Sequence, residues 1–144
     1  MDTGLPVTEE GIDAFIAAFE DGSLPKGRWT HGAHILTGAC YVHALGEVAA
    51  LERMRARVQA YNVAVGGQNT ETSGYHETVT VLWIKILSGF RGEHPGLGRA
   101  EFAGQAVDHF VGQRDILRRY YDYDVVGSVE ARRQWVPPTL RQVE

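Results

Sequence analysis

The sequence has a single cysteine, Cys40, so it cannot form an intrachain disulfide or a metal site built mainly from cysteines. A metal ion would need histidine and carboxylate ligands. Long apolar runs are also missing, since no segment reaches about 18 consecutive apolar residues. The opening Met1-Asp2-Thr3-Gly4 lacks the basic and apolar stretches of a signal peptide. We therefore expect a soluble, cytoplasmic protein.

An excess of positive charge is absent as well. The 14 Lys and Arg against 18 Asp and Glu give a formal net charge of −4, which is unfavourable for binding the phosphates of nucleic acids. Repeats and low-complexity segments are missing, which excludes solenoids and long linkers. The 144 residues, 44% of them hydrophobic, are enough for one compact domain over 1–144.

Capping residues and glycines divide the chain into helix-length segments. Thr8, Thr30 and Ser128 are typical N-cap residues, and Gly46 and Gly66-Gly67 are typical helix stops. Helices are predicted over about Thr8–Asp21, His31–Leu45, Glu47–Val65, Tyr75–Phe90, Arg99–Val111, Arg114–Asp122 and Ser128–Arg133. The strand-like segments Thr78–Val81 and Tyr123–Val126 are the alternatives, and Val79, Trp83 and Ile86 share a helical face. The prediction is all-α: an up-and-down bundle of four main helices plus short C-terminal helical pieces.

Three histidines fall on helix faces that should be buried. His31 and His34 are three residues apart on the apolar stripe of their helix, and His76 shares a stripe with Val79 and Trp83. His43 projects to the opposite side, as a surface histidine would. Burying three imidazoles is unfavourable unless their nitrogens are satisfied, so something must compensate.

A divalent metal ion would compensate, because it takes neutral imidazole nitrogens. His31, His34 and His76 can supply three corners of a tetrahedron and leave the fourth open for water or substrate. Zinc is the simplest choice, and nickel or ferrous iron suits three imidazoles nearly as well. His109, on the apolar side of its helix, is a reserve ligand. The alternative is a set of core histidines satisfied by hydrogen bonds without metal.

Two charged residues, Glu77 and Arg55, each have two possible roles. His76-Glu77 resembles the start of the zincin motif H-E-x-x-H, although its last position is Thr80. Glu77 is the candidate proton carrier, or it faces solvent. Arg55 falls on the apolar stripe of its helix, where it either clamps an anionic substrate group or pairs with an acid such as Asp115 or Glu77.

The remaining candidates are pocket walls and a closing segment. Trp135 before Pro137-Pro138 predicts a lid across the bundle, anchored by Arg132. Cys40 is expected to be an inert, buried thiol. The candidate substrate-binding residues are Arg55, Tyr61, Asn62, Thr80, Trp83 and Tyr121.

Two motifs carry a resemblance to known proteins. Trp29-Thr30-His31-Gly32-Ala33-His34 and Gly74-Tyr75-His76-Glu77-Thr78 resemble the W-T-H-x-A-H and G-Y-H-E-T motifs of a family of small, uncharacterised bacterial helical proteins. That likeness covers about residues 25–140 and implies no particular activity. A looser, architectural likeness is to the DinB-like bundles, which have a three-histidine metal site. In those bundles the single histidine precedes the pair.

The leading hypothesis is a small metal-dependent enzyme. The ion would act as a Lewis acid or water activator on a small organic substrate, by hydrolysis, elimination, isomerisation or oxidation. The second hypothesis is a non-enzymatic small-molecule-binding bundle with a buried histidine hydrogen-bond network and no metal. The third is a pure interaction module. Neither nucleic acid nor membrane is expected as a partner, and a homodimer through a leftover apolar helix face is compatible with the sequence.

Overall fold

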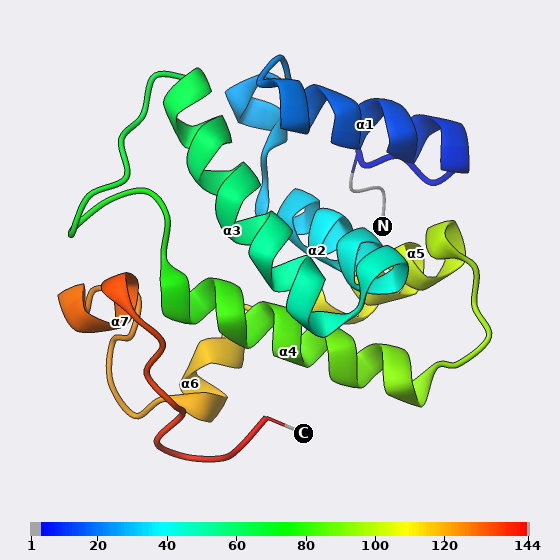
Figure 1. Ribbon diagram of the computed structural model, residues 1–144. Helices are drawn as coiled ribbons and strands as arrows, with labels where there is room; N and C mark the ends of the chain where they lie inside the picture. Colours follow the sequence, from blue (N-terminus) through cyan, green and yellow to red (C-terminus); the bar gives the residue numbers. More distant parts are fainter. Residues whose placement is uncertain (1–3, 144) are drawn as a thin grey trace.

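The computed structural model describes residues 4–143, and all regular structure in that range is helical (Figure 1). The all-α bundle prediction is therefore confirmed, and Thr78–Val81 is helical as expected. The prediction for the opening residues Met1–Thr3 lies outside the described range. None of the described helices is long and apolar enough to span a membrane. The helices are α1 (Glu9–Asp21), the 3-10 helix η1 (Lys26–Arg28), α2 (His31–Leu45), α3 (Glu47–Ala64), α4 (Glu77–Glu93), α5 (Arg99–Phe110), α6 (Ile116–Tyr120) and α7 (Val129–Arg133).

The predicted capping residues begin their helices. The hydroxyls of Thr8, Thr30 and Ser128 accept the N–H groups of the residues three positions later, at 3.1, 3.2 and 3.2 Å. Gly46 ends α2 with φ of 82°, a conformation that glycine adopts without strain. These contacts explain why the sequence predicted both ends of α2 correctly.

Helix α4 starts two residues later than predicted. Its N-cap is His76, whose Nδ1 accepts the N–H of Val79 at 3.1 Å. His76 therefore precedes the helix, whereas the sequence analysis placed it within the helix. A histidine ring that caps a helix uses one nitrogen for the backbone.

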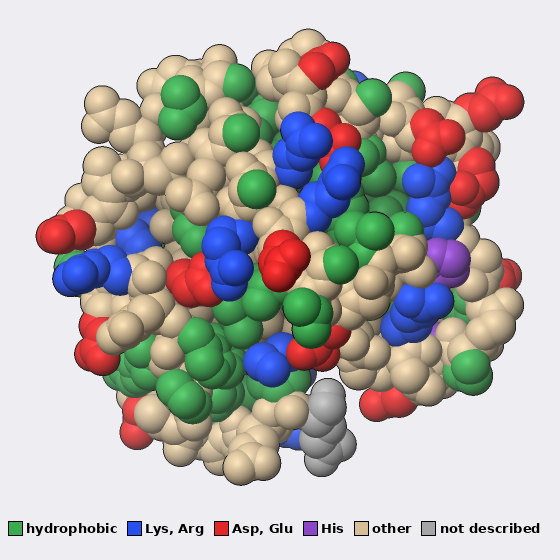
Figure 2. Space-filling model, viewed as in Figure 1, with side chains coloured by type: hydrophobic (Ala, Val, Ile, Leu, Met, Phe, Trp, Pro, Cys, Tyr) green, Lys and Arg blue, Asp and Glu red, His purple; other side chains and the backbone are tan. Residues whose placement is uncertain are grey.

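Helix α2 is the centre of the bundle and packs against α3, α4 and α5 (Figure 1). Its small residues allow close approach: a Cβ added at Gly38 would lie 3.0 Å from Leu87 Cδ1 of α4. Cys40 is buried in this helix, and burial raises its pKa to about 12, so the thiol stays protonated as predicted. Basic and acidic side chains intermingle on the surface shown in Figure 2.

The C-terminal segment lies along the start of α4. Thr78 Oγ1 donates to Gln134 O at 2.8 Å and accepts the N–H of Val136 at 2.9 Å. Arg132 donates to Gly74 O at 2.8 Å and to Val126 O at 3.3 Å. Arg132 thus links α7 to the chain before α4 and to the segment that precedes α7.

Replacing Thr30 by alanine removes the cap of the central helix. We expect Thr30→Ala to lower the free energy of unfolding by about 1 kcal/mol, because the N–H of Ala33 loses its acceptor. Thr30→Ser keeps a hydroxyl and should remain close to wild type. Urea unfolding followed by far-UV circular dichroism measures both. Equal losses in the two variants would contradict the capping role.

Candidate functional site

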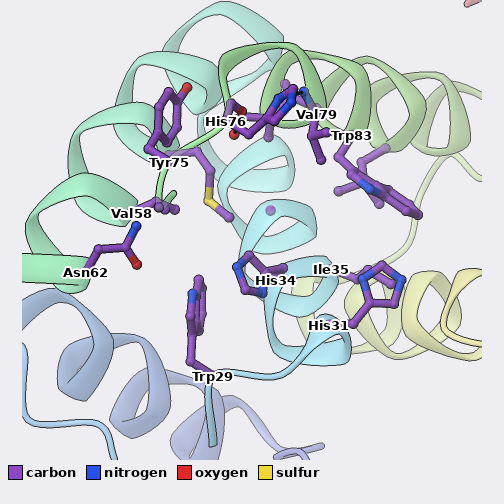
Figure 3. Close-up of a pocket in the computed structure, with 16 residues that line it drawn as sticks. Trp29, His31, His34, Ile35, Val58, Asn62, Tyr75, His76, Val79 and Trp83 are labelled. Carbon is purple, nitrogen blue, oxygen red and sulfur yellow. Dashed lines mark hydrogen bonds between the residues drawn. The ribbon is translucent and has the colours of Figure 1, made fainter. Parts of the chain in front are cut away.

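Helices α2, α3 and α4, together with the segments that precede α2 and α4, enclose a cavity of about 300 Å³ (Figure 3). This volume is at the lower end of the range for small-molecule sites. Among residues 4–143, no Lys, Arg, Asp or Glu lines it. The lining consists of Trp29, His31, His34, Ile35, Gly38, Met54, Val58, Asn62, Gly74, Tyr75, His76, Val79, Thr80, Trp83, Ile84 and Leu87.

The helix faces inferred from the sequence meet at this cavity. Each helix contributes positions three or four apart, such as His31, His34 and Ile35 from α2 and Thr80, Trp83 and Leu87 from α4. The cavity receives all three predicted histidines, together with the predicted wall residues Asn62, Thr80 and Trp83.

His34, which lines the cavity, has one ring nitrogen without a hydrogen-bond partner among residues 4–143. Its Nδ1 lies 2.8 Å from the carbonyl oxygen of Thr30, and a carbonyl can only accept, so Nδ1 carries the proton. Nε2 therefore keeps its lone pair, and no residue in the range 4–143 hydrogen-bonds to it. Burial lowers the pKa of His34, followed by repulsion from His31, although the bond to Thr30 opposes them. The ring is neutral at pH 7.

Trp29 has a buried polar atom without a partner. Its ring stacks on Phe19 and contacts His34, with centroid distances of 4.1 Å in both pairs. The indole N–H is buried and finds no hydrogen-bond acceptor within the described chain. Such orphaned donors are rare in native proteins and cost about 1–3 kcal/mol. Trp29 is also one of the residues that line the cavity.

His76 uses both ring nitrogens for the protein itself. Nδ1 accepts the N–H of Val79, so Nε2 carries the proton and donates it to Val125 O at 2.9 Å. Figure 3 shows its ring next to Val79, away from His34 and Trp29. As placed, His76 has no lone pair to offer a metal ion. Within residues 4–143, no three His, Cys, Asp or Glu side chains are grouped so that they could hold one.

His31 is the most exposed of the three histidines. Its ring packs edge-on against Trp83, with 5.5 Å between centroids, and it makes no hydrogen bond to the described residues. Burial of part of the ring, and then the charge of Arg114, lower its pKa. His31 therefore stands at the solvent side of the cavity.

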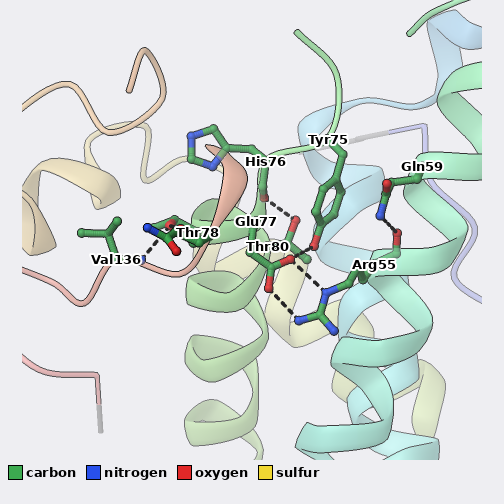
Figure 4. A network of polar contacts seen from close by, with 9 residues as sticks. Arg55, Gln59, Tyr75, His76, Glu77, Thr78, Thr80 and Val136 are labelled. Atoms are coloured by element: carbon green, nitrogen blue, oxygen red, sulfur yellow. Dashed lines mark hydrogen bonds and ion pairs between the residues drawn. The ribbon is translucent and has the colours of Figure 1, made fainter. Parts of the chain in front are cut away.

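Glu77 and Arg55 lie outside the cavity and bind each other (Figure 4). Arg55 Nε and Nη2 donate to the two carboxylate oxygens at 2.9 and 2.6 Å, and Tyr75 Oη donates to Glu77 at 2.6 Å. Burial raises the Glu77 pKa, but the bonds from Arg55 and Tyr75 outweigh it and hold the pKa below its usual value. Of the two roles considered for Arg55, the structure forms the pairing with Glu77.

Two predicted wall residues, Tyr61 and Tyr121, also lie outside the lining. Tyr61 Oη donates to Leu24 O at 2.7 Å, and Tyr121 Oη donates to Val136 O at 2.6 Å. Both rings are buried and fix neighbouring chain segments. Neither the apolar stripe that contains Tyr61 nor the tyrosine pair that contains Tyr121 shows which side of a buried ring borders a cavity.

The other two histidines considered above lie away from the cavity. His109, the reserve ligand, is exposed and packs on Phe90 with 5.2 Å between ring centroids. His43 is half-buried, whereas the helical wheel placed it at the surface, and its Nε2 lies 2.9 Å from Leu97 O. The loop before α5 covers this side of α2, which the wheel could not show.

Trp29 and Tyr75 line the cavity but were not among the residues predicted from the sequence. Both precede helices, so neither takes part in a helical stripe. A usable signal was present, because each stands directly before a helix-capping residue, Thr30 or His76, and belongs to the motifs described above.

Comparison with protein-family models, curated proteins and solved structures finds no match to this chain. The resemblance drawn from the two histidine motifs therefore stays a prediction. Function has to be inferred from the cavity itself.

The neutral, capping state of His76 predicts a pH effect. Burial lowers its pKa, so below about pH 6.5 the unfolded chain binds more protons than the folded one, and stability falls as the pH drops. The slope is at most about 1.4 kcal/mol per pH unit for one group. His76→Asn keeps a capping oxygen but does not titrate. We expect it to flatten the dependence of the unfolding free energy between pH 7 and 5, measured in urea.

The matched variant His76→Ala removes the cap as well. It should share the flatter pH dependence but lose about 1 kcal/mol more stability at pH 8 than His76→Asn. A wild-type slope in either variant would contradict the assignment.

Proposed function

We propose that the protein binds a small, uncharged, largely apolar organic molecule that carries an oxygen acceptor. The observation that carries this proposal is the buried, unpartnered indole N–H of Trp29 at an apolar cavity. Filling the cavity with an acceptor would satisfy this donor and bury apolar ligand surface at once. This is the second of the three hypotheses drawn from the sequence.

The size and polarity of the cavity limit the ligand. At about 30 Å³ per water-sized group, about 300 Å³ holds roughly ten non-hydrogen atoms. An ionised group would lose its hydration without a counter-ion, since no charged residue within 4–143 lines the cavity. His34 Nε2 adds an acceptor beside the Trp29 donor. A hydroxyl group, which can donate and accept, suits this pair, whereas a carbonyl oxygen suits the Trp29 donor alone.

A set of three related probes tests the proposal. We expect 2-naphthol to bind with a saturable change in tryptophan fluorescence, since Trp29 and Trp83 both line the cavity. Trp29→Phe keeps an aromatic ring but loses the donor, so it should weaken 2-naphthol about five- to tenfold, the worth of one hydrogen bond. Naphthalene, which lacks the hydroxyl, should bind both proteins equally, and ionised 2-naphthoate should bind poorly.

If none of these probes binds saturably, the proposal is contradicted and the interaction module is favoured. Strong binding of 2-naphthoate with weak binding of 2-naphthol would contradict the neutral character of the site.

The metal-dependent enzyme is our second proposal. It is favoured by His31 and His34, which share one face of α2 and line the cavity without a hydrogen bond to Nε2 from residues 4–143. His76 does not fit as placed, because a metal would require its ring to release both Val79 and Val125.

Elemental analysis of protein purified without a histidine tag tests this second proposal. A metal site would give about one equivalent of divalent ion, lost in both His31→Ala and His76→Ala. Ion-free protein that gains no thermal stability from added zinc, nickel or ferrous iron would overturn it.

A further inference from the structure

We infer that His34 is a catalytic base that moves a proton on a carbonyl compound bound in the cavity, with the indole N–H of Trp29 hydrogen-bonded to the carbonyl oxygen. The reaction class is isomerisation of an enolisable ketone or aldehyde. This inference rests on the proposed binding function and adds a chemical activity to it.

The first requirement is a base with a free, oriented lone pair. The bond from Nδ1–H to Thr30 O fixes the tautomer of His34 and the plane of its ring. Nε2 is left without a partner in the described chain, at a cavity that a substrate could fill. In histidine bases generally, a hydrogen bond to one ring nitrogen orients the ring, and the other nitrogen acts on the substrate.

The second requirement is a donor for the oxygen that becomes negative. Trp29 is held between Phe19 and His34, so its indole N–H has little freedom to move. It is already desolvated, and a hydrogen bond to developing charge is strongest in such an apolar site. The rings that carry the donor and the base are in contact, with 4.1 Å between their centroids, so the two groups lie within the span of one small molecule.

The other titratable groups nearby are committed elsewhere. His76 has no lone pair to spare, and the Glu77 carboxylate accepts bonds from Arg55 and Tyr75 outside the cavity. His31 makes no hydrogen bond to residues 4–143, but its ring is exposed beside Trp83 and no contact fixes its tautomer. His109, exposed and away from the cavity, is the control histidine for His34.

The proton transfer balances without a co-reactant. Nε2 of His34 takes a proton from the carbon next to the carbonyl, and the electron pair of that C–H bond forms a C=C bond. The carbonyl π pair moves to the oxygen, where Trp29 N–H stabilises it. The imidazolium then returns its proton to the same carbon, or to the far end of a conjugated C=C bond, and the carbonyl re-forms. No bond order is gained or lost overall.

Deuterium exchange measures this step directly. The probe is 2-tetralone, an aromatic ketone of the expected size, in D₂O with and without EDTA. NMR follows the exchange of its C1 protons, and tryptophan fluorescence measures its binding. Wild-type protein should accelerate exchange well above the rate in buffer with an equal concentration of imidazole. His34→Gln should bind the ketone but lose at least tenfold in exchange, since general bases contribute about 10²–10⁴-fold. His109→Gln, at an exposed histidine away from the cavity, should exchange like wild type.

A second variant guards against a folding defect at position 34. The Asn side chain of His34→Asn can still donate to Thr30 O but lacks the outer nitrogen, so it should lose exchange while circular dichroism remains native. Trp29→Phe should slow exchange more than it weakens binding of the ketone.

The outcomes separate the two proposals. Binding of 2-tetralone without accelerated exchange in wild-type protein would overturn the catalytic inference and leave the binding function standing. Exchange that persists in both position-34 variants, or that EDTA abolishes, would also overturn it, the latter in favour of the metal-dependent enzyme. Failure of every probe to bind would overturn both.

Discussion

The site depends on the backbone carbonyl of Thr30 and its bond to His34. The same residue caps α2 with its hydroxyl, so the start of the central helix and the orientation of the imidazole are set by one amino acid. Since a carbonyl cannot donate, this contact decides which nitrogen of His34 carries the proton. The chemical character of the cavity follows from where the helix begins.

Polar groups are divided between two environments with different physics. The lining of the cavity has no Lys, Arg, Asp or Glu among residues 4–143, and an unpaired buried donor such as the Trp29 N–H costs free energy there. The charged pair Arg55–Glu77 lies at a more polar cleft, where water reduces both the gain and the cost of an ion pair. Tyr75 lines both spaces and donates to Glu77, so one side chain forms the boundary between them.

Much of the architecture could be predicted because it is encoded locally. Thr30 and Gly46 mark the ends of α2 by hydrogen bonding and backbone conformation within a few residues. The faces of α2, α3 and α4 that border the cavity follow from the spacing of apolar residues. The same spacing predicted that His31 and His34 lie on the inner face of α2, where both line the cavity.

Features that depend on contacts far apart in sequence could not be predicted. His76 was taken as a helical residue because nothing near it in sequence shows that its ring caps α4 and donates to Val125. Glu77 borders the apolar face on a wheel, yet Arg55 of α3 draws it to the other side. Trp29 belongs to no helix, so periodicity carried no information about its place in the cavity.

Helix α1 influences the cavity without lining it, because Phe19 of α1 stacks on Trp29. Phe19 belongs to α1, no residue of which lines the cavity, yet its ring supports the indole face to face at 4.1 Å. A substitution on α1 that shifts this ring would change the aim of the indole donor. If the cavity binds the proposed ligand, variation in α1 offers a way to retune its selectivity without altering a single wall residue.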